Sequence, residues 1–456
     1  MLRLRYLATL LMILLPSLAF GADYTVCAAA CDYTTIQDCD DAAVRGDSCT
    51  VSAGTYAERV LVTTAASGTD TITFTAIGTV NMLGFLIQAD YIIVDGFAIN
   101  NTADCDAYAN WLELRRDCSG VQIEGDYVQV LNNTITGAPY HGVTTLGSSY
   151  TAAPHYATIT GNTITNVGFV GIITGGTNHL INNNDISAVV QWHGDTLDAD
   201  DSDGIRFYGT DQIFRGNFIH DIPQTGGNAT SHIDCFQTGQ GTATTILFER
   251  NICYNECATL GQGALVTAGA GITVSDITFQ YNVFRMTGED RCCLNTDRTL
   301  GVGTVANIAF NNNVCATLVT ESQLGVNIDQ VAGAEVKNNI FYNFGDATYN
   351  YVYDQQENTG LDIGYNLIYK GNAVEPAAPG AYSNDVWMDD PVFSNFSASN
   401  FHLQSTSPAI NVGTDLSLTT DCDNNSVPVG SAPDIGAYEY NPTNMSGSTI
   451  IGGSED

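Results

Sequence analysis

The sequence has very few basic residues. Its 456 residues include 14 lysines and arginines against 49 aspartates and glutamates, so the formal net charge is −35. Only Lys337 and Lys370 are lysines. A surface this acidic repels nucleic acid and anionic membranes, and we expect neither as a partner. It suits a saline environment or divalent cations, and an anionic substrate would need Ca²⁺ or a few placed arginines to screen it.

Long apolar runs are missing after the N-terminus. The one such run covers residues 6–20, follows Arg3 and Arg5, and is interrupted by Pro16. A small-residue cleavage pattern comes next. The arrangement is typical of a secretory signal peptide at residues 1–21 rather than a membrane anchor. We therefore expect a soluble protein exported to the periplasm or the extracellular space.

Paired Cys-x-x-Cys motifs with histidines are also lacking, which disfavours a structural zinc site. The thirteen cysteines favour disulfides in an oxidising compartment. Several stand close together in the sequence, namely Cys27, Cys31, Cys39 and Cys49, then Cys105 and Cys118, then Cys253 and Cys257. Because the count is odd, at least one thiol stays unpaired or pairs between chains. The sequence leaves the connectivity open.

What the chain does have is a repeat built on asparagine. The repeating residues, 22 to 34 positions apart, are Asn133, Asn162, Asn184, Asn217, Asn251, Asn282, Asn313, Asn339 and Asn366. An apolar residue stands three positions before each of them, and an apolar residue or a cysteine stands two positions after. Apolar residues alternate within a repeat, as at Ile246 and Phe248, which indicates a strand.

Stacked strands of successive repeats must run parallel, and the interval leaves no room for a helix in each. We therefore expect an all-β fold, a right-handed parallel β-helix of about ten or more coils that lie about 4.8 Å apart. The asparagines would mark the turns between sheets. Asparagine tolerates left-handed backbone angles, and its amide can bond to the amide one coil along. This ladder predicts the fold and not the function.

A second motif follows the first in many coils. It comprises Ser119-Gly-Val-Gln, His141-Gly-Val-Thr, Val170-Gly-Ile-Ile, Asp203-Gly-Ile-Arg, Asp234-Cys-Phe-Gln and Leu324-Gly-Val-Asn, and predicts another sheet in register with the first. Residues 34–44 have the pattern of a short helix that caps the N-terminal end, and residues 401–411 and 433–440 would close the fold. We expect one domain over residues 22–440 and a polar tail over 441–456.

Three parts of the sequence together carry a family resemblance. They are the opening Tyr33-Thr-Thr-Ile-Gln with Gly54-Thr-Tyr and Glu58-Arg-Val, the asparagine repeat, and the closing Ser407-Pro-Ala-Ile and Asp434-Ile-Gly-Ala-Tyr-Glu-Tyr. Over nearly the whole mature chain, the sequence resembles secreted bacterial right-handed parallel β-helix proteins of the pectate-lyase-like superfamily. That resemblance implies a glycan substrate or ligand, and it covers polysaccharide lyases, glycoside hydrolases, epimerases and non-catalytic adhesins.

Two adjacent coils, 33 and 34 residues long, carry the charged side chains that could do chemistry. Alignment on the second motif pairs Asp201 with His232, Asp203 with Asp234, and Arg206 with Gln237. Paired residues would lie about one strand spacing, roughly 4.8 Å, apart. A slip of one residue in register would scatter this grid of catalytic candidates.

The grid is compatible with several kinds of chemistry. β-Elimination on a uronic acid needs a group that neutralises the carboxylate, a base for the C5 proton and an acid for the leaving oxygen. Arg206 could neutralise and His232 could be the base, with Asp203 or Asp234 orienting it or holding Ca²⁺. Hydrolysis would instead use two of the aspartates as acid and base. The grid could also bind sugar without catalysis, or it could be a structural ladder in which Arg206 satisfies the aspartates.

Inserts before the second motif would wall a groove beside the grid. The expected substrate-binding residues are Trp111, Arg115, Arg116, Trp192, His193 and Tyr208. Aromatic rings stack on sugars, and arginines bind carboxylates. The alternative for Trp111 and Trp192 is that they only cover the core under the inserts. Asp195, Asp198 and Asp200 form a candidate Ca²⁺ site. They lack EF-hand spacing, and the alternative is an acidic surface loop. His141 heads the second motif two coils before Asp203 and could line the far end of the groove, but we favour an ordinary surface histidine at this position.

The grid departs from the better-known pectate and alginate lyases of the superfamily. These use a catalytic lysine or arginine beside Ca²⁺, and neither lysine here lies near the grid. The usual paired-aspartate order of polygalacturonase-like hydrolases is absent too. We expect a monomeric, secreted lyase on an anionic glycan, with no cofactor except Ca²⁺. The alternatives are an inverting glycoside hydrolase, a C5-epimerase or a non-catalytic glycan-binding protein such as an adhesin.

Overall fold

The computed structural model describes most of the chain after residue 20. The described residues are 21–68, 70–103, 105, 111–147, 153–190, 202–223, 233–255, 261–287, 292–296, 303–317, 324–344, 351–354, 358–370, 382 and 384–442. The expected signal peptide, up to residue 20, and the expected tail from residue 443 lie outside them.

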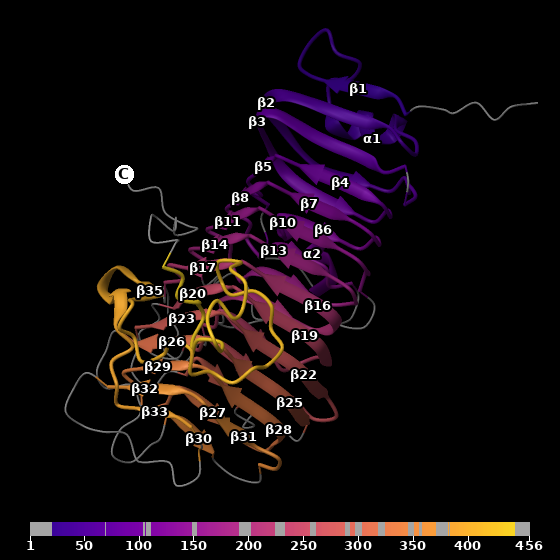
Figure 1. The fold of residues 1–456 in the computed structure, drawn as a ribbon. Coiled ribbons are helices and arrows are strands. Elements are labelled where there is room, and N and C mark those ends of the chain that lie inside the picture. The colour runs from indigo at the N-terminus through magenta and orange to yellow at the C-terminus, as the bar shows by residue number, and fades with distance from the viewer. Residues whose placement is uncertain are drawn as a thin grey trace, which may run out of the picture.

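Short parallel strands from successive coils stack into three sheets. Sheet 1 precedes the ladder asparagine and contains β4 (Ile92–Asp95), β7 (Gln129–Leu131), β10 (Thr158–Thr160), β13 (Leu180–Asn182), β16 (Gly209–Arg215), β19 (Ala243–Glu249), β22 (Thr273–Gln280), β25 (Thr304–Asn311), β28 (Val331–Lys337) and β31 (Asp362–Gly364). Sheet 2 follows the asparagine and contains β5 (Ala98–Ile99), β8 (Thr134–Thr136), β11 (Thr163–Thr165), β14 (Asp185–Ser187), β17 (Phe218–His220), β20 (Ile252–Asn255), β23 (Val283–Met286), β26 (Val314–Thr317), β29 (Ile340–Tyr342), β32 (Leu367–Tyr369) and β33 (Val386–Trp387). Sheet 3 is the second motif and contains β6 (Val121–Ile123), β9 (His141–Thr144), β12 (Val170–Thr174), β15 (Asp203–Phe207), β18 (Phe236–Thr238), β21 (Ala264–Val266), β24 (Leu294–Asn295), β27 (Val326–Ile328) and β30 (Val352–Asp354). The predicted parallel β-helix is confirmed (Figure 1).

The N-terminal end is built from longer strands, β1 (Asp23–Val26), β2 (Ser48–Val62) and β3 (Ile72–Ile87). β3 pairs in turn with β4, β5 and β6, so this one strand runs through all three sheets, and β2 pairs with β3 along its length. The expected capping helix is α1 (Ile36–Ala42). The Thr35 hydroxyl caps it by accepting the N–H of Asp38 over 3.0 Å, and the Glu58 carboxylate accepts the N–H of Ile36 over 2.9 Å.

The ladder asparagines join the coils as the sequence predicts. The main-chain N–H and the side-chain amide of Asn184 both donate to Oδ1 of Asn217, each over 3.0 Å. Asn217 donates in the same way to Asn251, and its amide also donates to the carbonyl of Ile181. All nine ladder asparagines are at most 1% exposed. The last one, Asn366, donates its N–H to Oδ1 of Asp385. The Asp385 carboxylate accepts this bond but has no amide group to donate to a further coil.

The left-handed turn residue is not the ladder asparagine, contrary to our expectation. It is the residue immediately before it, as at Asn132 (φ 53°), Asn183 (φ 53°) and Gly216 (φ 62°). Arg250 and Tyr281 take this conformation as well. The ladder position therefore requires a side chain that has both a hydrogen-bond donor and an acceptor. The residue before it adopts the left-handed backbone conformation of the turn.

Glycine in the second motif has a steric cause. An ideal Cβ on Gly171 would lie 2.5 Å from Cγ2 of Ile186, and one on Gly204 would lie 2.5 Å from Cγ2 of Ile219. In the next coil these two positions are Cys235 and Cys253, which form a disulfide. These two positions are too close together for a Cβ atom to face an isoleucine, and the same short distance lets two cysteines form a disulfide.

The described cysteines pair largely as disulfides, which confirms that expectation. The pairs are Cys27–Cys31, Cys39–Cys49, Cys105–Cys118, Cys235–Cys253 and Cys293–Cys315. Cys422 is a free thiol. Cys257 lies outside the described residues, so its expected proximity to Cys253 stays a prediction.

The closing segment, residues 389–440, lies along the side of the helix (Figure 1). It contains β34 (Phe393–Asn395), the 3₁₀ helix η1 (Phe396–Ala398) and β35 (Asn400–Leu403). Phe401 and Ile435 belong to an apolar cluster with Val314 and Ile340 on the outer face of sheet 2. The remaining helix, α2 (Trp111–Cys118), precedes β6. None of the described helices is long and apolar enough to cross a membrane.

Removing one rung should destabilise the whole stack. Asn217→Ala leaves the buried N–H of Asn184 without its acceptor and removes one donor from the carbonyl of Ile181. An unsatisfied buried group costs about 1–3 kcal/mol. We expect a clear fall in the midpoint of urea unfolding. Exposed Asn100 is the control, and Asn100→Ala should change stability by no more than about 0.5 kcal/mol. If both substitutions lowered the urea midpoint equally, the ladder would not contribute to stability as we infer.

The disulfide column can be tested by restoring the glycine pattern. The double variant Cys235→Gly with Cys253→Ile copies Gly204 and Ile219, and should fold with a loss of at most about 3 kcal/mol from the missing cross-link. The control, Cys235→Ala with Cys253→Ile, adds one methyl group against the isoleucine. It should be less stable by about a further 1–3 kcal/mol in thermal unfolding. If the alanine variant were equally stable, the steric account would be wrong.

Candidate functional site

The two charged coils meet on sheet 3 in the predicted register. β15 pairs with β18 so that Arg206 is the partner of Gln237. The main-chain N–H of Asp234 donates to Oδ1 of Asp203 over 2.9 Å. Because their neighbours Ile205 and Phe236 point into the core, Arg206 and Gln237 lie on the outer face. The alignment of these four residues is confirmed, whereas their catalytic roles stay predictions.

The carboxylates of Asp203 and Asp234 are fully buried and bind the main chain. Asp203 forms a buried ion pair with Arg206. Asp234 Oδ1 accepts the N–H of Gln262 over 2.7 Å, and Gln262 Oε1 accepts the N–H of Cys292 over 2.8 Å. Side chains at one position thus join successive coils. This geometry favours a structural ladder for the two aspartates, because an inverting hydrolase needs room for water between its carboxylates.

Seven expected site residues lie outside the described part of the chain. They are Asp195, Asp198, Asp200, Asp201, Trp192, His193 and His232. Their assignments stay predictions. Trp111 begins α2, and its side chain is likewise not described. Within the described ranges, no group of three or more His, Cys, Asp and Glu side chains could hold a metal ion.

The two arginines of α2 have different surroundings. Arg116 forms a double ion pair with Glu124, with Nε–Oε1 2.5 Å and Nη2–Oε2 2.7 Å. It therefore fastens the helix to the end of β6. Arg115 donates from Nη2 to the carbonyl of Gly147 over 2.7 Å. Arg115 is also close enough to His141 to influence its protonation.

An apolar cluster covers the outer face of sheet 3 beside α2. Its members are Cys105, Leu114, Cys118, Tyr140, Leu146, Phe169, Val170, Ile173 and Tyr208. Tyr140 and Phe169 stack in successive coils with their ring centroids 5.3 Å apart. Cζ of Arg206 lies 4.5 Å from the Phe169 centroid, a cation–π contact. Tyr208, expected as a surface contact for substrate, is 3% exposed within this cluster.

His141, expected as an ordinary surface histidine, is instead buried beside this cluster. It lies among these rings, with its centroid 3.9 Å from that of Tyr140. It is 1% exposed, and no described residue forms a hydrogen bond with its Nδ1. Burial lowers the pKa of His141 well below the usual 6.5, and the positive charges of Arg115 and Arg206 lower it further. The imidazole is therefore neutral at physiological pH, with a nitrogen available for a ligand or proton.

One feature of the sequence points to the buried position of His141. Tyr140 precedes His141 as Phe169 precedes Val170, so an aromatic column runs beside the head of the second motif. β9, β12 and β15 pair so that His141, Val170 and Asp203 occupy that head position in successive coils. What the sequence lacked was the path of α2, which brings Arg115 near the ring.

Other buried polar atoms on or beside sheet 3 have no hydrogen-bond partner among the described residues. They are Ser119 Oγ, Gln122 Oε1, Thr174 Oγ1, Ser202 Oγ, Gln237 Oε1 and Thr238 Oγ1. Such atoms are rare in folded proteins and often mark places that water or a ligand completes. Together with His141, they make sheet 3 from β6 to β18 the candidate site.

Comparison with known proteins agrees with this architecture. A family model described as "Protein of unknown function (DUF1565)" matches residues 39–234, less than half of the chain. No curated protein sequence matches. The solved complex of XylC with xylose is similar over 91% of this chain and 98% of its own, with a TM-score of 0.55 and 13% identity. The likeness shows the fold, which is the predicted parallel β-helix.

Other β-helix structures align less closely. The pectate lyase Pel9A has a TM-score of 0.47 and 14% identity, covering 89% of this chain and 91% of its own. The PL6 family alginate lyase AlyGC has a TM-score of 0.48 and 12% identity, covering 85% and 57%. At these identities the likeness concerns the β-helix fold alone. The site must be judged on its own residues.

The buried ion pair offers a direct test of the sheet 3 geometry. Asp203→Asn keeps an oxygen for the N–H of Asp234 but removes the charge that faces Arg206. Breaking a buried pair from one side costs about 3–5 kcal/mol, so the urea midpoint should fall strongly. The exposed pair Arg45–Asp70, at 3.5 Å, is the control. Asp70→Asn should cost about 1 kcal/mol or less. A similar small loss in both variants would contradict the paired, buried state of Asp203.

Proposed function

We propose that the protein is an exported enzyme that cleaves an acidic polysaccharide by β-elimination, with its reaction centre at His141 on sheet 3. The observation that carries the proposal is a neutral, buried imidazole with a free nitrogen and two arginines nearby. Export is supported by the N-terminal signal pattern and by the disulfides.

The residues around His141 match the demands of the reaction. A neutral imidazole can take the C5 proton of a uronate, and the released electron pair forms the C4–C5 double bond as the C4–O bond breaks. Arg115 and Arg206 supply positive charge for the uronate carboxylate, which stabilises the carbanion-like transition state. A tyrosine hydroxyl, from Tyr140 or Tyr208, is the candidate donor for the leaving oxygen.

For His141 to act as the base, the glycan must be able to reach its ring. His141 is 1% exposed, so the surrounding side chains must move when the glycan binds. The same burial keeps its pKa low. His232, which lies outside the described residues, remains the alternative base, and Ca²⁺ at Asp195, Asp198 and Asp200 remains a proposal for screening the substrate.

A C5-epimerase is the second candidate, because it begins with the same proton abstraction. Removal of the C5 proton by His141, followed by donation of a proton to the opposite face from a second group such as the Tyr140 or Tyr208 hydroxyl, would invert that carbon without breaking the chain. Hydrolysis is less well supported, since Asp203 and Asp234 are engaged by Arg206 and by main-chain N–H groups.

The proposal is tested with a panel of polyuronates, with and without EDTA. Elimination gives an unsaturated product that absorbs in the ultraviolet, hydrolysis gives reducing ends without that absorbance, and epimerisation changes only the proton spectrum of the polymer. We expect ultraviolet absorbance. New reducing ends alone, or binding with no reaction, would overturn the lyase proposal.

The base is tested by His141→Gln, which should lower kcat/KM by about 10²–10⁴-fold with the fold retained. His179 is the matched control, because it is also buried but both ring nitrogens are used, by the N–H of Ala157 and the carbonyl of Gly175. His179→Gln should lower the melting temperature and leave activity per folded molecule unchanged.

The pH profile gives an independent readout of the same assignment. A base must be neutral to accept a proton. Because its pKa is lowered, His141 stays neutral at mildly acidic pH, where an ordinary histidine with a pKa of 6.5 is already protonated. The acidic limb of kcat/KM should therefore have its midpoint below 6.5. A midpoint at or above 6.5, or full activity of the His141→Gln protein, would exclude His141 as the base.

A further inference from the structure

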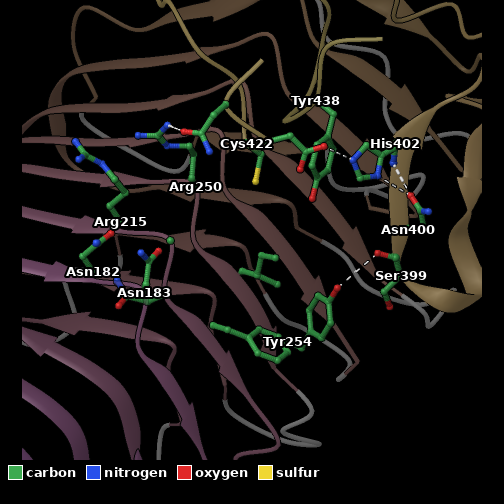
Figure 2. Close-up of a pocket in the computed structure, with 16 residues that line it drawn as sticks. Asn182, Asn183, Arg215, Arg250, Tyr254, Ser399, Asn400, His402, Cys422 and Tyr438 are labelled. Carbon is green, nitrogen blue, oxygen red and sulfur yellow. Dashed lines mark hydrogen bonds and ion pairs between the residues drawn. The ribbon is translucent and has the colours of Figure 1, made fainter. Parts of the chain in front are cut away.

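A cavity of about 320 Å³ lies where the closing segment meets the turns between sheets 1 and 2 (Figure 2). One wall comes from three successive coils and carries Asn182, Phe218 and Tyr254, whereas the opposite wall carries His402 and Tyr438. We propose that this pocket is a second carbohydrate site, which takes the uronate end of a short acidic oligosaccharide. The proposal does not rest on elimination at sheet 3.

The pocket is held in shape by specific contacts between segments distant in sequence. Arg250 donates to the side chain of Asn424, 174 residues later. Arg285 donates from Nη1 to Oγ of Ser399 over 2.7 Å, and its Cζ lies 4.1 Å from the ring centroid of Tyr254. Both walls are therefore tied together by arginines, and the cavity is a built feature of the fold.

Arg215 gives one end of the pocket its affinity for an anion. Its Nε pairs with Glu249 over 2.5 Å, and its side chain is 38% exposed. Its two Nη groups make no hydrogen bond to any described residue. A guanidinium with a free edge binds a carboxylate through two parallel hydrogen bonds. The amides of Asn182 and Asn183 lie at the same end and can bond to ring hydroxyls (Figure 2).

The other end of the pocket is aromatic. The rings of His402 and Tyr438 have centroids 4.0 Å apart, and Asp423 fixes His402 through a 2.7 Å bond to Nε2. Phe218 meets Tyr254 edge to face at 5.4 Å. Aromatic faces, amides and a free guanidinium edge together suit a sugar ring that carries a carboxylate.

Charge and size narrow the ligand. In a chain with net charge −35, an anion needs positive side chains at its site, and Arg215 and Arg250 both line this pocket. The carboxylate of Asp423 lines it too and is bonded to His402. The volume is at the low end of the roughly 300–1,000 Å³ typical of ligand sites, which limits the occupant to one or two sugar rings. The pocket borders sheet 2 and the closing segment, whereas His141 belongs to sheet 3.

The experiment is calorimetric titration of the full mature protein with four probes, namely glucuronate, glucose, a diuronate and a long polyuronate. Glucose carries a neutral hydroxymethyl group where glucuronate carries the carboxylate, so it should bind at least tenfold more weakly. Affinity should rise from glucuronate to the diuronate. The long polyuronate should bind no more tightly than the diuronate when its concentration is counted as chain ends. Equal binding of glucose, no binding of either uronate, or affinity that keeps growing with internal chain length would overturn the proposal.

Variants locate the binding in this pocket. Arg215→Gln should weaken glucuronate binding by roughly tenfold or more, as expected for the loss of hydrogen bonds to a charged group. Should that variant fold poorly, Asn182→Asp keeps the Arg215–Glu249 pair and places a repelling charge at the same end. Arg45→Gln, in a remote exposed pair, is the control and should bind normally.

The His141→Gln protein separates this inference from the proposed function. It should bind glucuronate with unchanged affinity even when it has lost elimination activity. Unchanged affinity in both Arg215→Gln and Asn182→Asp would show that the pocket is not the site, whatever the outcome at sheet 3.

Discussion

The structure depends on the amide ladder that links each coil to the next. Burying a turn between two sheets removes its main-chain N–H from water, and that group then needs an acceptor inside the protein. Asparagine supplies the acceptor and also a donor for the next rung, so the solution repeats along the stack. The direction of the bonds explains the end of the ladder at Asp385, whose carboxylate accepts the N–H of Asn366 and donates nothing. With the turns fixed in this way, the residues of sheets 1, 2 and 3 must align across coils.

Sheet 3 uses the same kind of bond in the opposite direction. Asp203, Asp234 and Gln262 each accept the main-chain N–H of the following coil. Residue types that often carry catalysis are therefore partly structural here, and their presence in a row is weak support for an active site. A more discriminating property is a buried polar side chain that the fold does not use. His141 has that property, because its ring is enclosed while its Nδ1 is bonded to no described residue.

Five arginines of this acidic chain lie in two places. Arg115 and Arg206 influence His141 on sheet 3, whereas Arg215, Arg250 and Arg285 lie under the closing segment. Each placement has a structural partner, such as Asp203 for Arg206 or Ser399 for Arg285. Arginines are thus present at both of the surfaces that we propose to receive an anionic glycan.

The sequence alone determined the architecture and the register. The spacing of the asparagines and of the second motif predicts which residues are neighbours across coils, because each coil is one repeat and register follows from the repeat length. The pairing of Arg206 with Gln237 is an example. Only the tertiary structure decided which of these neighbours are buried, because exposure depends on inserts whose path has no periodic pattern. It placed α2 over sheet 3, so that Arg115 approaches His141. It also brought the closing segment back along sheet 2, where contacts between Arg250 and Asn424 span 174 residues and no local rule of spacing could reveal them.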